Sequence, residues 1–111
     1  MATDTVDAVI ANLKLATVFG SRVYRGWPPV TALQPVCGVQ EYEVGESDTD
    51  HHLARWNVQI DSWAKSPIDI VAIKAAIKVV AEVYHSVVTY RSIPESGSIH
   101  IVSTLAVLGG F

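Results

Sequence analysis

Residues 66–85 constrain the fold of this chain most strongly, because they predict a helix that is apolar on nearly every side. Ser66 can cap this helix, and Pro67 suits its first turn, where the missing N–H costs no hydrogen bond. Polar side chains recur only every four residues, at Lys74, Lys78 and Glu82. Such a helix is buried on more than one side. The chain's own sheet can cover one side, so we expect a second subunit to cover another.

A second helix is predicted near the start of the chain, over about residues 5–18. Val6, Val9, Ile10 and Leu13 recur there at helical spacing. Gly20 follows at the position where a glycine commonly ends a helix.

The strands are predicted from alternation and from β-branched residues. The clearest one covers residues 53–63, where Val58 and Ile60 alternate with Asn57 and Gln59. Others are expected at 23–24, over 35–44 and over 99–108, and a further short strand at 87–93 is left open because Pro94 interrupts it. Residues 45–50 are polar and acidic, so they predict a loop that joins two strands into a long hairpin.

These elements predict a single α+β domain over residues 1–111. The expected order is α-β-β-β-α-β, with about four strands in a mainly antiparallel sheet. The simplest packing places both helices on one face of that sheet.

Composition excludes several classes of function. Half of the 111 residues are hydrophobic, 17% are charged, and the net charge is −3. Nucleic-acid binding needs a basic stripe for phosphates, and the sequence has none. No apolar stretch reaches the roughly 18 residues of a membrane span, so no membrane partner is expected. The only cysteine, Cys37, excludes an internal disulfide and a cysteine-based zinc site.

The densest polar cluster is Asp48, Asp50, His51 and His52. Carboxylates and imidazoles are ligands for divalent metals, so a metal site is one interpretation. The favoured interpretation is a solvated hairpin tip, because adjacent histidines on a strand point to opposite faces. We therefore expect no metal and no cofactor.

Residue types of a hydrolytic triad occur at Asp61, Ser62, His85 and His100. They fall on different predicted elements, and no glycines of a nucleophile elbow surround Ser62. Cys37 lies among apolar strand residues and is interpreted as a buried thiol. No catalytic residue is assigned, and the chain is not expected to be an enzyme.

A tryptophan beside two prolines marks residues 27–29. Trp27 can anchor a partner surface, or it can fold back over the edge of the sheet, and the sequence favours neither. Trp56 is expected in the core, and Trp63 lies on the opposite strand face. The candidate interface residues are Arg25, Trp27, Trp63, Lys74 and Lys78.

Four stretches together carry a resemblance to a known family. A helix ends in Phe-Gly-Ser-Arg-Val-Tyr at 19–24, prolines mark a loop at 27–36, and Arg-Trp-Asn-Val-Gln-Ile-Asp-Ser-Trp at 55–63 precedes a helix rich in Ala, Ile and Val. This arrangement, over about residues 5–85, resembles the tail-terminator and tail-completion proteins of long-tailed bacteriophages.

The resemblance implies a structural virion protein of the tail or neck, assembled in the host cytoplasm. Such proteins form a ring, typically a hexamer, that caps the tail tube protein and meets the head-side connector protein. DNA passes through the lumen, where acidic side chains would repel its phosphates. The candidates for a lumen or tube-contact loop are Glu46, Asp48 and Asp50.

Two alternatives remain open at this stage. One is a head-completion protein of the same neck. The other is a dimeric α+β module that binds a small ligand in a pocket lined by Tyr24, Tyr42 and Trp56.

Overall fold

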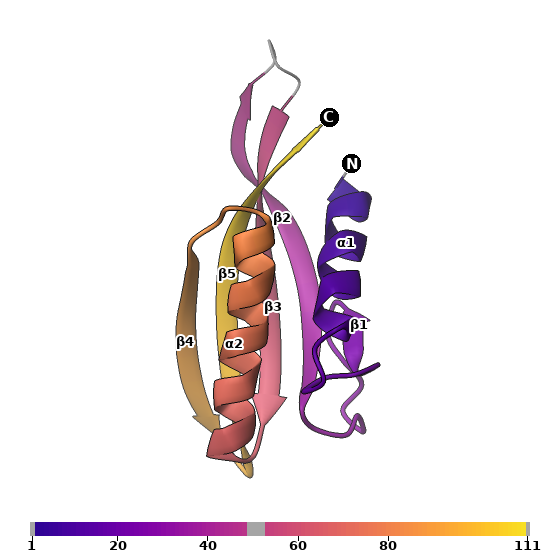
Figure 1. The fold of residues 1–111 in the computed structure, drawn as a ribbon, viewed down its shortest axis with the longest axis vertical. Coiled ribbons are helices and arrows are strands. Elements are labelled where there is room, and N and C mark those ends of the chain that lie inside the picture. The colour runs from indigo at the N-terminus through magenta and orange to yellow at the C-terminus, as the bar shows by residue number, and fades with distance from the viewer. Residues whose placement is uncertain (1, 49–52, 111) are drawn as a thin grey trace.

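The computed structural model describes residues 2–48 and 53–110. It has two helices and five strands in these ranges: α1 (Ala2–Lys14), β1 (Val23–Arg25), β2 (Val36–Asp48), β3 (Leu53–Ala64), α2 (Pro67–Val83), β4 (Val88–Glu95) and β5 (Ser98–Gly110). Figure 1 shows them in an elongated molecule, 48 Å long and about 22 Å across.

The strands form one mostly antiparallel sheet in the order β1-β2-β3-β5-β4. Only β1 runs parallel to its neighbour, β2. The predicted α+β class is confirmed, but the sheet has five strands where about four were expected. The additional strand is β4, whose segment was left open because of Pro94. A proline is tolerated there because β4 lies at the edge of the sheet.

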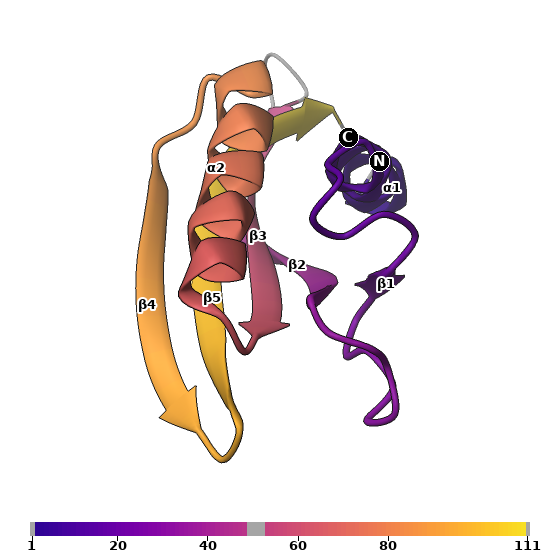
Figure 2. The same ribbon diagram turned by 60° about the horizontal axis from the view of Figure 1, so that its bottom comes forward.

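Both helices pack on the same face of the sheet, as predicted (Figure 2). Their apolar faces meet the strand residues that point toward them, and this contact forms the core. The core is built around the fully buried side chains of Val9, Leu13, Val39, Val58, Ile60, Ile73, Ile77, Ile101 and Leu105.

The first helix is earlier and shorter than predicted, since it ends at Lys14. The chain then continues in turns that bring Phe19 fully into the core. Gly20 closes these turns with a φ of +57°, a backbone conformation that glycine adopts without strain, and its N–H donates to the Ala16 carbonyl at 3.1 Å.

The predicted acidic loop at 45–50 is corrected by the structure, because β2 continues through Asp48. The pairing of β2 with β3 shifts register between Glu43 and Ser47, as at a β-bulge. Beyond the shift the two strands pair again, so the hairpin continues to Asp48. Glu46 and Asp48 therefore lie on a strand, whereas Asp50 lies outside the described residues. The hairpin of β2 and β3 extends beyond the helices (Figure 1).

Candidate functional site

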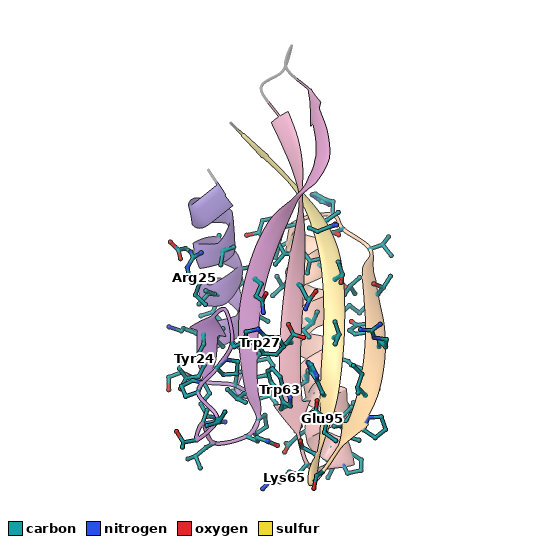
Figure 3. The ribbon with its side chains drawn as sticks, turned by 180° about the vertical axis from the view of Figure 1, so that it is seen from behind. Tyr24, Arg25, Trp27, Trp63, Lys65 and Glu95 are labelled. Atoms are coloured by element: carbon teal, nitrogen blue, oxygen red, sulfur yellow. The ribbon has the colours of Figure 1, made fainter. Side chains whose placement is uncertain are left out.

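One face of the sheet carries no helix. The alternation of side chains along β3 determines which of its residues lie on that face. Val58, Ile60 and Ser62 point toward the helices and are fully buried. Residues of the other parity, including Asp61 and Trp63, therefore lie on the helix-free face, which Figure 3 shows toward the viewer.

A buried histidine links three strands on this face. His100 of β5 places its Nε2 atom 2.8 Å from an Asp61 carboxylate oxygen and its Nδ1 atom 3.2 Å from a Glu95 carboxylate oxygen. Asp61 is almost completely buried, and its second oxygen accepts a hydrogen bond from the Gln59 amide at 2.9 Å. Glu95 also accepts from the Trp63 indole N–H at 3.2 Å.

This arrangement satisfies its own polar groups. Each ring nitrogen of His100 lies within hydrogen-bonding distance of a carboxyl oxygen, so both nitrogens are occupied by the network. The network therefore ties β3, β4 and β5 together.

Two tryptophan rings lie against the histidine of the network, and one of them stacks on it. The rings of Trp63 and His100 are nearly parallel, with centroids 4.4 Å apart. Trp27 lies 5.6 Å from Trp63 and meets His100 edge-on at 6.2 Å. Of the two interpretations of Trp27, the structure has the tryptophan folded back over the sheet, with 63% of the residue still exposed.

A glycine allows the loop after β1 to lie directly on the sheet. A Cβ atom at Gly38 would lie 2.0 Å from the Gly26 carbonyl oxygen and 2.9 Å from Cδ of Pro28. The Gly26 N–H also donates to the Val39 carbonyl at 2.8 Å. The absence of a side chain at Gly38 is therefore what lets Trp27 reach Trp63.

Between this loop and the end of the hairpin of β4 and β5 lies a groove of about 400 Å³, which we call the tryptophan groove. The Oε1 atom of Gln34 belongs to a groove residue and is buried without a hydrogen-bond partner among the described residues. Among the described residues that line the groove, Glu95 is the only charged one. The lining residues are Trp27, Pro28, Pro29, Val30, Ala32, Gln34, Val36, Trp63, Glu95 and Ser98.

The opposite side of the molecule has a second uncovered apolar surface. Four residues of α2 that face away from the core form it, and we call them the outer stripe: Ile68, Val71, Val79 and Val83. They are between 54% and 81% exposed, although each is a large aliphatic side chain. The structure therefore confirms that α2 carries more apolar surface than its own chain covers.

The remaining interface candidates lie around α1 and α2. Arg25 forms an ion pair with Asp7 of α1, so it fastens the first helix to the edge of the sheet. Lys74 lies 5.8 Å from the ring centroid of Tyr90, and Lys78 is exposed beside the outer stripe. The structure thus places Trp27 and Trp63 together in the tryptophan groove, and it places Lys74 and Lys78 on α2.

The residue types of a hydrolytic triad are not assembled. Ser62 points into the core, on the face of the sheet opposite to Asp61 and His100. His85 follows α2, with a φ of +53°. Cys37 is buried as predicted, and burial raises the pKa of its thiol to about 12, which keeps the thiol protonated.

Three further expectations concern a metal site, a ligand pocket and a membrane span. Within residues 2–48 and 53–110, no cluster of three His, Cys, Asp or Glu side chains is arranged to hold a metal ion. Of the predicted metal cluster, Asp50, His51 and His52 lie outside the described residues. Of the three residues predicted to line a ligand pocket, Tyr24 does not line the tryptophan groove. The side chains of the other two, Tyr42 and Trp56, lie outside the description.

No described helix is long and apolar enough to cross a membrane.

The sequence did not predict that Asp61, Glu95 and His100 form one network. A signal for part of it existed, because Asp61 and His100 are ionisable residues within predicted strands, and ionisable side chains that become buried are usually paired. Gln34, in the wall of the tryptophan groove, was not singled out by any pattern.

No protein family and no curated protein matches this sequence. Among solved structures, the chain is similar to a chain in the virion of a native gene transfer agent (GTA) particle. The TM-score is 0.54 at 18% sequence identity, and the match covers 91% of this chain and 92% of the other. The likeness shows that the two chains share one fold along nearly their whole length.

Proposed function

We propose that this protein is a structural component of a phage-like virion that assembles with copies of itself into a closed ring. In this proposal the ring, most simply a hexamer, caps the tail tube protein and joins it to the head-side connector protein. It has no enzymatic activity and needs no cofactor. Assembly takes place in the host cytoplasm before the ring enters the tail or neck.

The observation that carries the proposal is the outer stripe of α2. Four large aliphatic side chains face solvent in the single chain, on a helix whose opposite side already fills the core. Burial of apolar surface is favourable by about 25 cal/mol per Å², so a neighbouring subunit that covers the stripe gains stability from it. The similarity to a chain of a virion particle supports a virion as the setting of this assembly.

The long hairpin supports the position of the ring on the tail. The paired strands β2 and β3 extend past the helices and carry Glu46 and Asp48 near their far end. We propose that these acids and Asp50 face the lumen or the tube. Their charge would keep DNA from adhering as it passes.

The first test is the mass and shape of the purified protein. We expect a ring with a central hole in negative-stain electron micrographs, and a mass of several subunits by light scattering, either alone or after addition of tail tubes. Ile68→Glu should abolish the ring, because the charge would be buried in the contact. Leu15→Glu is the matched control, since Leu15 and Ile68 are both 81% exposed in the single chain.

Other outcomes decide against the proposal. A stable dimer would favour the ligand-binding module, and a monomer that does not assemble on tail tubes would contradict a ring. Purified heads and tails separate the remaining alternative, because a tail terminator binds tails that lack it, whereas a head-completion protein binds heads.

A further inference from the structure

The outer stripe and the tryptophan groove are uncovered apolar surfaces on opposite sides of the sheet. The outer stripe lies on the side that carries the helices, and the tryptophan groove lies on the helix-free side. We infer that the outer stripe of one copy docks in the tryptophan groove of the next copy. This inference rests on the proposed ring and names the two surfaces that build it.

The positions of the two surfaces favour a head-to-tail contact. A contact between different surfaces of identical chains repeats from copy to copy, and it closes into a ring when the rotation allows. The first half of α2 lies at the same height along the molecule as Trp63 and Glu95 (Figures 1 and 3). If the long axes of the copies run parallel to the ring axis, successive copies need no rise along it, as a closed ring requires.

The order of charges along the two surfaces is complementary. On α2, Lys74 and Lys78 precede Glu82, which lies toward the hairpin end of the molecule. On β4 the sign is reversed, because Glu95 lies at the groove and Arg91 lies closer to the hairpin. The spans also agree, at about 12 Å from Lys74 to Glu82 on a helix and about 13 Å from Arg91 to Glu95 on a strand.

Two of the polar groups in the wall of the tryptophan groove are acceptors, the Glu95 carboxylate and the Gln34 amide oxygen. The Glu95 carboxylate is partly exposed, and the Gln34 Oε1 atom is buried without a donor among the described residues. A lysine ammonium carries three donors and no acceptor. Lys78 is exposed beside the outer stripe and can supply such donors to the partly exposed Glu95 carboxylate, which a second apolar surface alone could not.

A mixing experiment with two variants tests the contact. Val71→Glu places a charge in the outer stripe, in the first half of α2, and Val30→Glu places one at the groove, where the valine is fully exposed in the single chain. Neither residue lies in the core, so both variants should fold and each should be monomeric. Mixed together they should form a heterodimer and nothing larger, because one intact stripe then meets one intact groove.

Native mass spectrometry separates the outcomes. If the Val30→Glu variant still forms rings or dimers by itself, the groove is not the partner of the stripe, and the inference fails while the proposed ring stands. If the mixture stays monomeric although the unmodified protein forms rings, the head-to-tail contact is likewise wrong. If the unmodified protein forms no rings with or without tail tubes, the proposed function itself fails.

Discussion

The network on the helix-free face and the outer stripe of α2 differ in whether contacts within one chain satisfy their side chains. On the helix-free face, a buried carboxylate, a histidine and a second carboxylate satisfy one another, and Trp27 covers them. On α2, Ile68, Val71 and their neighbours in the outer stripe face solvent with nothing above them. The network of Asp61, Glu95 and His100 is complete within one chain, whereas we propose that another chain covers the outer stripe.

The difference indicates which contacts stabilise the folded chain and which stabilise the association of copies. Changes in the network of Asp61, Glu95 and His100 should alter the stability of the single chain. Changes in the outer stripe should alter association and leave the fold intact. The predictions below test this division, beginning with the largest expected effect.

The largest effect is expected from breaking the buried network. His100→Leu leaves Asp61 buried with a charge that only Gln59 contacts, so the free energy of unfolding should fall by about 3–5 kcal/mol. Urea denaturation followed by circular dichroism measures this loss. The double variant with Asp61→Asn should recover part of the stability, because it removes the unpaired charge. A loss below about 1 kcal/mol, or no recovery, would show that the network does not stabilise the chain.

A methyl group at Gly38 should separate the loop from the sheet. Gly38→Ala sets a Cβ against the Gly26 carbonyl and Pro28, and overpacking of this kind costs about 1–3 kcal/mol. The contact between the tilted rings of Trp27 and Trp63 should open, with a red shift in tryptophan fluorescence. Ala32→Gly, in the same loop, should leave the fluorescence unchanged. Unaltered fluorescence and stability in Gly38→Ala would contradict the close approach.

The buried thiol should make stability fall at alkaline pH. Cys37 ionises in the unfolded chain near its ordinary pKa of 9.0, but in the folded chain only at about 12. The folded state therefore holds the extra proton between these values, and stability should fall as pH rises through them, by up to about 1.4 kcal/mol per pH unit. Cys37→Ala should show a shallower decline over pH 8–10. Equal slopes for the two proteins would contradict burial of the thiol.

The smallest effect is expected from a charge exchange between the proposed partners. Arg91→Glu or Glu82→Arg alone should weaken association of the rings by up to about fivefold, since exposed ion pairs contribute about 0.2–1 kcal/mol. The double variant should restore the original association, measured by sedimentation at low salt. Additive weakening in the double variant would show that the two residues do not face each other in the ring.

Local signals explain what the sequence predicted well. The Ser66 hydroxyl accepts a hydrogen bond from the Asp69 N–H at 3.1 Å. This is the bond expected of a serine that caps a helix three residues before the donor. Alternation likewise predicted the orientation of Val58 and Ile60 in β3. Both features depend on residues within a few positions of one another.

Long-range contacts explain what the sequence did not predict. Asp61 and His100 are 39 positions apart, and no local pattern predicts their contact. The strand β4 exists because β5 pairs with it, and its edge position makes Pro94 harmless. The continuation of β2 to Asp48 depends in the same way on β3, which holds the acidic segment in register.

Thiol labelling of the outer stripe is the most direct test of the claim that another subunit covers it. Cys37 is buried and protonated, so a cysteine introduced as Val79→Cys would be the reactive thiol of the folded chain. We predict that labelling of this cysteine slows at least tenfold at concentrations where rings form, relative to dilute protein, whereas Leu15→Cys reacts equally fast in both. Equal labelling of Val79→Cys in rings and in dilute protein would show that the stripe stays open to solvent and is not the surface on which the ring is built.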